Sequence, residues 1–77
     1  MSGNADHELD ATGLKCPMPV LRARRALKPL AVGERLLVRA DDPASAKDFP
    51  AFCKTTGHLL EDVTKVEGEF RFLIQKA

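Results

Sequence analysis

Two prolines separated by a single residue, Pro17 and Pro19, set the point at which this chain changes from extended to helical backbone. Proline is tolerated in the first turn of a helix, because the N–H groups there have no intrahelical partner. Proline also disfavours helical angles in the residue before it. Cys16 is therefore predicted to occupy the amino-terminal cap of a helix, directly after a strand.

The segments on either side of this junction have different hydrophobic periods. Residues 7–11 alternate, with Leu9 and Ala11 on one face, which predicts a short half-buried strand. After the prolines, apolar residues recur at steps of three and four, which predicts a helix. Pro29 implies that this helix ends near Lys28 or kinks there.

The next part of the chain repeats the order of strand and helix. Residues 35–40 alternate most clearly and predict the strongest strand. Asp42 as a cap and Pro43 in the first helical position predict the start of a second helix. Gly57 predicts its end. Pro50 lies inside this segment, so its early part is predicted to be bent or broken.

Two more strands are predicted at the carboxyl end, from residue 58 to about 66 and from 70 to 76, joined as an antiparallel hairpin. The element order is then βαβαββ. The economical α/β solution is a two-layer sandwich, in which a four-stranded mixed sheet has both helices packed on one face. We expect residues 1–6 to form a flexible N-terminus and residues 7–77 to form a single domain.

The amino-acid composition argues against several classes of function. Twelve Lys and Arg against eleven Asp and Glu leave a net charge of +1, so no global basic field for nucleic acid is expected. No apolar run reaches membrane-spanning length and the first residues lack signal-peptide features, so we expect a cytoplasmic protein. The two cysteines form no CxxC pair, which argues against a dithiol site or a zinc knuckle. We expect neither a metal nor a cofactor.

Cys16 is the main candidate for chemistry. The amino end of a helix carries partial positive charge and unpaired N–H groups, which favour a thiolate over a thiol. Lys15 adds to this effect, whereas Pro17 and Pro19 remove two amide donors. We therefore predict a modestly lowered pKa for Cys16. The alternative is a small residue that only caps the helix, although cysteine is a poor cap.

Other polar residues are assigned structural roles. Cys53 lies on the predicted buried face of the second helix, which indicates an inert core thiol. His58 follows a helix end, where a structural hydrogen bond is favoured over catalysis. Asp41, Asp42 and Asp48 are interpreted as capping or surface carboxylates and not as an acid/base pair.

A basic stripe on the first helix contains Arg22, Arg25 and Lys28. It is either the solvated face of the helix or a docking surface for an acidic partner. Met18, between the two prolines, is expected to be exposed and is a further candidate for partner contact.

A series of short motifs occurs in one order: Leu9-Asp10, Gly13-Leu14, Cys16-Pro17-Met18-Pro19, Gly33-Glu34 with Leu36 and Val38, Ala40-Asp41-Asp42-Pro43, Asp48-Phe49-Pro50 with Phe52-Cys53, Gly57-His58 and Phe72-Leu73-Ile74. In this order they resemble the TusA/SirA family of small sulfur-carrier proteins, from about Glu8 to Lys76. The CPxP motif at 16–19 alone is weak evidence, and the resemblance rests on the whole series of matches in this order. The fold that the resemblance implies, a two-layer α/β sandwich, agrees with the periodicity. Phe49 stands where isoleucine is common in the family.

The resemblance implies that Cys16 carries sulfur as a persulfide, supported by Pro17, Pro19 and Lys15, with Arg22, Arg25 and Met18 as docking residues. A cysteine desulfurase or rhodanese-type donor would supply the sulfur. A TusD/DsrE-like or molybdenum-cofactor-related protein would accept it, for tRNA 2-thiouridine synthesis or related sulfur trafficking. Such a protein is a sulfurtransferase-type persulfide relay and acts as a carrier rather than as a multiple-turnover enzyme. Exchange at sulfur needs an accessible thiolate and no metal.

Two other classes stay open at this point. One is a non-enzymatic RNA-binding or regulatory interaction module, since fold alone does not give function. Balanced charge and the lack of Trp and Tyr argue against it, and we expect no stable nucleic-acid or membrane binding. The other is a redox sensor thiol, which would need a resolving cysteine near Cys16.

Overall fold

The structure is a computed structural model and describes residues 5–77. Its elements are β1 (His7–Asp10), α1 (Met18–Leu27), β2 (Arg35–Ala40), α2 (Ser45–Thr56), β3 (Leu59–Val66) and β4 (Glu69–Gln75). The predicted βαβαββ order is confirmed. Most of the predicted flexible N-terminus lies outside the described residues. Asp6 belongs to that predicted terminus and is bound to β2. Its N–H donates to the Arg35 carbonyl (3.1 Å), and its Oδ2 accepts from the Arg35 N–H (3.0 Å).

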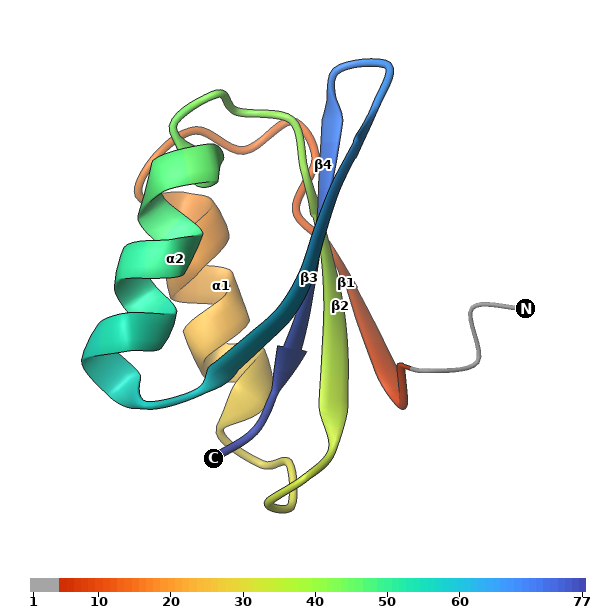
Figure 1. Cartoon of the computed structure of the whole chain (residues 1–77). Coiled ribbons are helices and arrows are strands. Elements are labelled where there is room, and N and C mark those ends of the chain that lie inside the picture. Colours follow the sequence, from red (N-terminus) through yellow and green to blue (C-terminus); the bar gives the residue numbers. More distant parts are fainter. Residues whose placement is uncertain (1–4) are drawn as a thin grey trace.

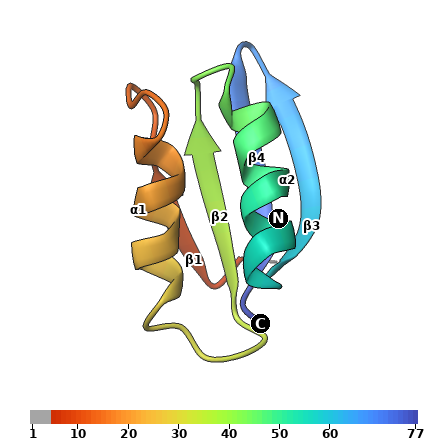
Figure 2. The ribbon, with the colours of Figure 1, turned by 90° about the vertical axis from the view of Figure 1, so that its left-hand side faces the viewer.

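The four strands form one sheet in the order β1-β2-β4-β3. β1 is parallel to β2, whereas β4 is antiparallel to both β2 and β3. Both helices cover the same face of this sheet (Figure 1), and they lie beside each other across it (Figure 2). The predicted mixed sheet with two helices on one face is therefore confirmed. Neither described helix is long and apolar enough to cross a membrane.

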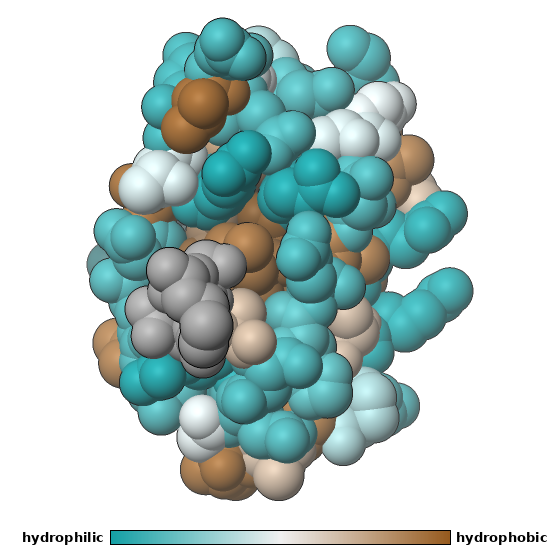
Figure 3. All heavy atoms as spheres, turned by 90° about the vertical axis from the view of Figure 1, so that its right-hand side faces the viewer, coloured by the Kyte–Doolittle hydropathy of each residue, from teal (hydrophilic) through white to brown (hydrophobic). Residues whose placement is uncertain are grey.

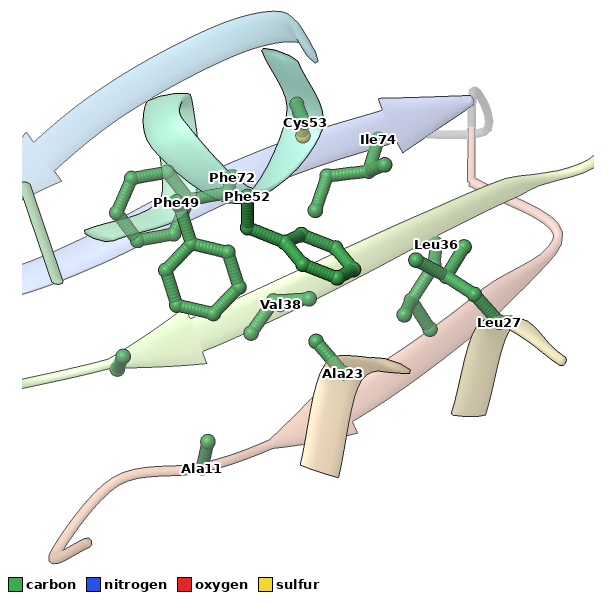
Figure 4. Close-up of a cluster of buried hydrophobic side chains, with 11 residues drawn as sticks. Ala11, Ala23, Leu27, Leu36, Val38, Phe49, Phe52, Cys53, Phe72 and Ile74 are labelled. Atoms are coloured by element: carbon green, nitrogen blue, oxygen red, sulfur yellow. The ribbon is translucent and has the colours of Figure 1, made fainter. Parts of the chain in front are cut away.

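The core lies between the helices and the sheet (Figure 4). Alternate residues of β2 and β4 point into it, and all of these are buried: Leu36, Val38, Ala40, Phe72 and Ile74. From α2, Phe49 is fully buried and stacks on Phe72 with 4.4 Å between ring centroids. Burial of such a side chain contributes about 1.5–3 kcal/mol. This packing fixes α2, and with it the polar residues on its exposed side.

The predicted break at Pro50 is wrong, because α2 runs without interruption from Ser45 to Thr56. The bond that a proline removes would have ended on the carbonyl of Ala46. Ala46 is exposed, so solvent can satisfy that carbonyl. The helix does end as predicted, at Gly57, whose φ of 85° lies in the left-handed region and whose N–H donates to the Cys53 carbonyl (2.8 Å).

The start of α1 also differs from the prediction. Pro17, not Cys16, is the cap residue, so Cys16 lies one position before the cap of the helix. The Cys16–Pro17 peptide bond is cis. The other end of α1 is tied to the sheet by Lys76, whose Nζ donates to three carbonyls at 2.8, 3.1 and 3.2 Å, those of Leu27, Lys28 and Leu30.

The sheet face that no helix covers is mostly hydrophilic, with apolar side chains between the charged ones (Figure 3). Arg39 on β2 lies at the centre of an ion-pair network on this sheet. It contacts Glu8 (3.0 Å) and Asp10 (3.2 Å) of β1 and Glu69 (3.8 Å) of β4. Arg71 also pairs with Glu69 (2.9 Å) and Arg35 with Glu61 (2.8 Å), so charges on this sheet largely neutralise one another.

Candidate functional site

Cys16 lies in the loop between β1 and α1, at the end of the molecule where the β2–α2 loop also turns (Figures 1 and 2). Two carboxylates from the β2–α2 loop hold the cysteine loop in place. The Gly13 N–H donates to Asp41 Oδ1 (2.9 Å), and the Cys16 N–H donates to Asp42 Oδ2 (2.6 Å). Gly13 has a φ of 80°, a conformation that favours glycine and allows the loop to turn toward these acceptors. The side chain of Cys16 is exposed.

The thiol itself contacts a third carboxylate. Cys16 Sγ donates to Oδ2 of Asp48, on the first turn of α2, at 2.9 Å. This hydrogen bond is the largest reason why the pKa of Cys16 is raised, followed by partial desolvation and by the negative charges of Asp48 and Asp42. The predicted lowering of this pKa is therefore wrong. Cys16 lies outside the helix it was expected to cap, and carboxylates from other segments surround it.

A groove of about 360 Å³ begins at the thiol and runs between the two helices. Val20 of α1 and Phe52 of α2 contribute apolar surface to it, and Asp48 and Arg24 contribute charge. The remaining lining residues are Pro17, Ala51, Thr55 and Thr56. This arrangement leaves Cys16 accessible to a second molecule along one side of the helix pair.

The basic residues of α1 have no carboxylate partner among residues 5–77, since every ion pair there joins side chains of the strands and of the turn before β2. Arg22 and Arg25, predicted as docking residues, are both exposed on this helix. The arginine that lines the groove with Cys16 is instead Arg24. Arg24 was not among the stripe residues predicted from the sequence, because its place in the groove depends on how α2 packs beside α1.

The other predicted site residues lie around the thiol loop. Lys15 is exposed and its carbonyl accepts from the Met18 N–H (2.8 Å). The Met18 side chain is 39% exposed, as predicted. Pro17 is exposed at the groove, whereas Pro19 is buried against the core. The two prolines therefore act differently: one shapes the thiol's surroundings and the other anchors the start of α1.

The remaining candidates have the structural roles predicted for them. Cys53 is 4% exposed, and burial raises the pKa of its thiol. His58 Nδ1 accepts from the Ala77 N–H (3.0 Å), and burial together with the charge of Lys76 lowers the pKa of the imidazole. Within the described part of the chain, no three His, Cys, Asp or Glu side chains are grouped so as to hold a metal ion.

Comparison with known proteins agrees with this geometry. The family model described as "Sulfurtransferase TusA" matches residues 7–76. This chain belongs to the TusA family. It is 50% identical over 72 residues to the "Sulfur carrier protein TusA" of Allochromatium vinosum, covering 94% of this chain and 95% of that protein. The crystal structure of a SirA-like protein from Desulfitobacterium hafniense matches with a TM-score of 0.78 and 30% identity, over 90% of this chain and 95% of the other.

The contact that sequence reasoning missed is the one between Cys16 and Asp48. Both residues belong to motifs that the family resemblance already quoted, but they are separated by 32 positions. Asp48 was interpreted as a capping or surface carboxylate, but the cap residue of α2 is Ala44, with no side-chain capping hydrogen bond, and Asp48 is half-buried on the first turn. Only the packing of α2 beside the cysteine loop shows that its side chain reaches the sulfur.

Proposed function

We propose that this protein is a sulfur carrier and that Cys16 holds the transferred sulfur as a persulfide on Sγ. The observation that supports this most directly is the contrast between the two cysteines. Cys16 is exposed at the head of a groove, whereas Cys53 is buried in the core. Membership of the TusA family supports the same role.

Sulfur transfer on this site follows thiol exchange chemistry. Cys16 loses its proton to solvent, and the thiolate attacks the outer sulfur of a donor persulfide. A bond forms from Sγ to that sulfur, and the donor S–S bond breaks. The donor cysteine leaves as a thiolate and takes up a proton. An acceptor thiolate then attacks the outer sulfur on Cys16 and forms a bond to it. The S–S bond to Cys16 breaks, and Cys16 leaves as a thiolate. No electrons are gained or lost overall.

The donor in this proposal is a cysteine desulfurase or a rhodanese-type protein, and the acceptor is a TusD/DsrE-like or molybdenum-cofactor-related protein. The sulfur would then serve tRNA 2-thiouridine synthesis or related sulfur trafficking in the cytoplasm. Both partners must approach Cys16 closely, so the adjoining surface has to dock them. The basic residues of α1, which lack carboxylate partners among residues 5–77, support docking of acidic surfaces. Arg22, Arg25 and Met18 are the residues proposed to make these contacts.

The test is sulfur loading by a cysteine desulfurase and cysteine, followed by mass spectrometry of the intact protein and its peptides. We expect a mass increase of one sulfur atom on the peptide that contains Cys16. Cys16→Ser should abolish it, and Cys53→Ala should keep it at a stability cost of about 1 kcal/mol. Loading that persists in Cys16→Ser but disappears in Cys53→Ala would show that the wrong cysteine has been assigned.

A further inference from the structure

Two carboxylates contact Cys16, and they act on different atoms. Asp42 accepts from the backbone N–H at 2.6 Å and so fixes the position of the residue. Asp48 accepts from the thiol at 2.9 Å, and its carboxylate makes no other hydrogen bond within the described residues. Its side chain is half-buried on the first turn of α2. Asp42 already holds the loop through the backbone, so the hydrogen bond to Asp48 acts on the sulfur alone.

We propose that Asp48 is a positioning residue that holds the unloaded carrier as a neutral thiol and favours return of the loaded carrier to that state. This inference rests on the proposed role of Cys16. The Sγ–H···Oδ2 hydrogen bond exists only while Sγ carries a proton. When sulfur is transferred onto Cys16, Sγ becomes bonded to the outer sulfur and has no proton left to donate. The contact is then lost, and the carboxylate faces the lone pairs of the S–S group.

The groove offers the loaded sulfur a different environment. An S–S bond of about 2.05 Å extends the side chain beyond the reach of the thiol. Asp48 from α2 and Arg24 from α1 line the groove with Cys16, and Asp42 from the β2–α2 loop accepts from the Cys16 N–H. Lys15 directly precedes Cys16 in the chain and is exposed. The thiol is stabilised on the Asp48 side of the groove, where it donates a hydrogen bond to the carboxylate. An anionic persulfide favours the cationic Arg24 side, where Val20 and Phe52 provide apolar surface.

A thermodynamic consequence follows from this difference. Any free energy by which Asp48 stabilises the thiol but not the persulfide shifts the loading equilibrium by the same amount toward the unloaded state. Asp48 therefore has two effects: it suppresses the reactivity of the free thiol with stray electrophiles, and it makes the loaded carrier a better sulfur donor. Removing the charge of Asp48 should therefore raise the reactivity of the free thiol and raise the loaded fraction at equilibrium.

The first experiment measures alkylation of Cys16 by iodoacetamide across roughly pH 6 to 11, a range that brackets the ordinary thiol titration near 8.5. Asp48→Asn keeps the shape and an acceptor oxygen but removes the charge. We expect the rate profile to move to lower pH, with severalfold faster alkylation at neutral pH. At high pH the variant should be no faster than wild type, because a less basic thiolate is the weaker nucleophile (Brønsted slope about 0.4–0.5).

The second experiment equilibrates the protein with a mixture of glutathione persulfide and glutathione and measures the loaded fraction by mass spectrometry. The ratio of loaded to unloaded Asp48→Asn should exceed that of wild type severalfold. Asp41→Asn is the matched control, because Asp41 lies in the same end of the molecule and holds Gly13 without touching the thiol. It should match wild type in both experiments.

The outcomes separate this inference from the proposed function. Profiles of wild type and Asp48→Asn that superimpose, or rates that rise equally at all pH values as in an opened loop, would overturn the inference. If the profile moves as expected but the wild-type protein never takes up sulfur, the proposed function fails and the hold of Asp48 on the thiol stands. If a thermal melt shows that Asp48→Asn is unfolded, Asp48→Ser replaces it, since serine is favoured near a helix start.

Discussion

Lys76 should stabilise the fold by joining the end of β4 to the end of α1. Its Nζ donates to the carbonyls of Leu27, Lys28 and Leu30, at 2.8, 3.1 and 3.2 Å. The carbonyls of Leu27 and Lys28 lie at the end of α1, where the helix dipole is negative, and that of Leu30 lies in the loop just after it. Lys76→Met keeps most of the apolar stem and removes the ammonium group. The substitution therefore isolates the polar contacts of this residue.

The magnitude follows from the kind of bond that is lost. Hydrogen bonds that involve a charged group contribute about 1.5–3 kcal/mol in favourable cases. Lys28 is exposed and Leu30 is half-buried, so water can replace part of what is lost. We therefore expect Lys76→Met to lower the free energy of unfolding by about 1–2 kcal/mol. A chain of 77 residues has a total stability of roughly 4–12 kcal/mol, so this loss is a substantial part.

Urea unfolding measures this directly. For so short a chain the slope is about 1 kcal/mol per molar urea, so the midpoint should fall by roughly 1–2 M. Because the acceptors are backbone carbonyls, the loss should persist in high salt. The control is Lys54→Met, which removes a lysine from the exposed last turn of α2. A midpoint for Lys76→Met within about 0.3 M of the control would refute the reasoning, since surface substitutions usually change stability by less than about 0.5 kcal/mol.

Lys76→Met should also change the pKa of His58. Burial and the charge of Lys76 lower the pKa of this imidazole, and burial is the larger cause. The folded protein therefore binds fewer protons than the unfolded chain in the window between the lowered pKa and the ordinary value of about 6.5. Stability should rise with pH through that window and be lost as pH falls through it. In Lys76→Met the His58 titration, followed by NMR, should move partway back toward the ordinary value.

Three further variants test the core and the proposed docking surface. Phe49→Ala should lower the free energy of unfolding by about 3–5 kcal/mol, because the ring is fully buried and stacked on Phe72; a loss under about 1 kcal/mol in urea unfolding would contradict this. Reversing both Arg22 and Arg25 to Glu should slow sulfur transfer from a protein donor and flatten its salt dependence, yet change iodoacetamide alkylation of Cys16 far less. Unchanged transfer would mean that this face is only solvated. Arg24→Glu, in the groove itself, should slow both reactions.

The elements could be predicted from the sequence because their signals are local. Leu36, Val38 and Ala40 alternate in the sequence and all three are buried on β2, and the bounds of that strand agree with the prediction. The helix starts were less accurate, because a cap depends on the geometry of the preceding loop. α1 begins after Pro17 and α2 begins at Ser45 instead of Pro43.

The electrostatics of the site could not be predicted in the same way. The helix-dipole argument considered only residues adjacent to Cys16 in the chain. The carboxylates that determine its pKa, Asp48 and Asp42, lie 32 and 26 positions away. A thiol at a junction between two loops is exposed to charges from every segment packed there, and a hydrogen bond at 2.9 Å outweighs a partial dipole. Cys16 could therefore be proposed as the sulfur-bearing residue from its local sequence, whereas the protonation of its thiol depends on the fold.

The net charge, like the protonation of Cys16, can be interpreted only when the fold is known. The total of +1 argues against a global field, but it combines two unlike surfaces. On the sheet, Arg39 is matched by Glu8, Asp10 and Glu69. On α1, the basic residues have no carboxylate partner within residues 5–77. The exposed side of α1 and the uncovered face of the sheet lie on opposite sides of the molecule (Figure 1), and the screening length at physiological salt is about 8 Å. Acidic groups on the sheet therefore do not cancel the field at α1, whose basic residues lie beside a cysteine loop that is itself held by Asp41, Asp42 and Asp48.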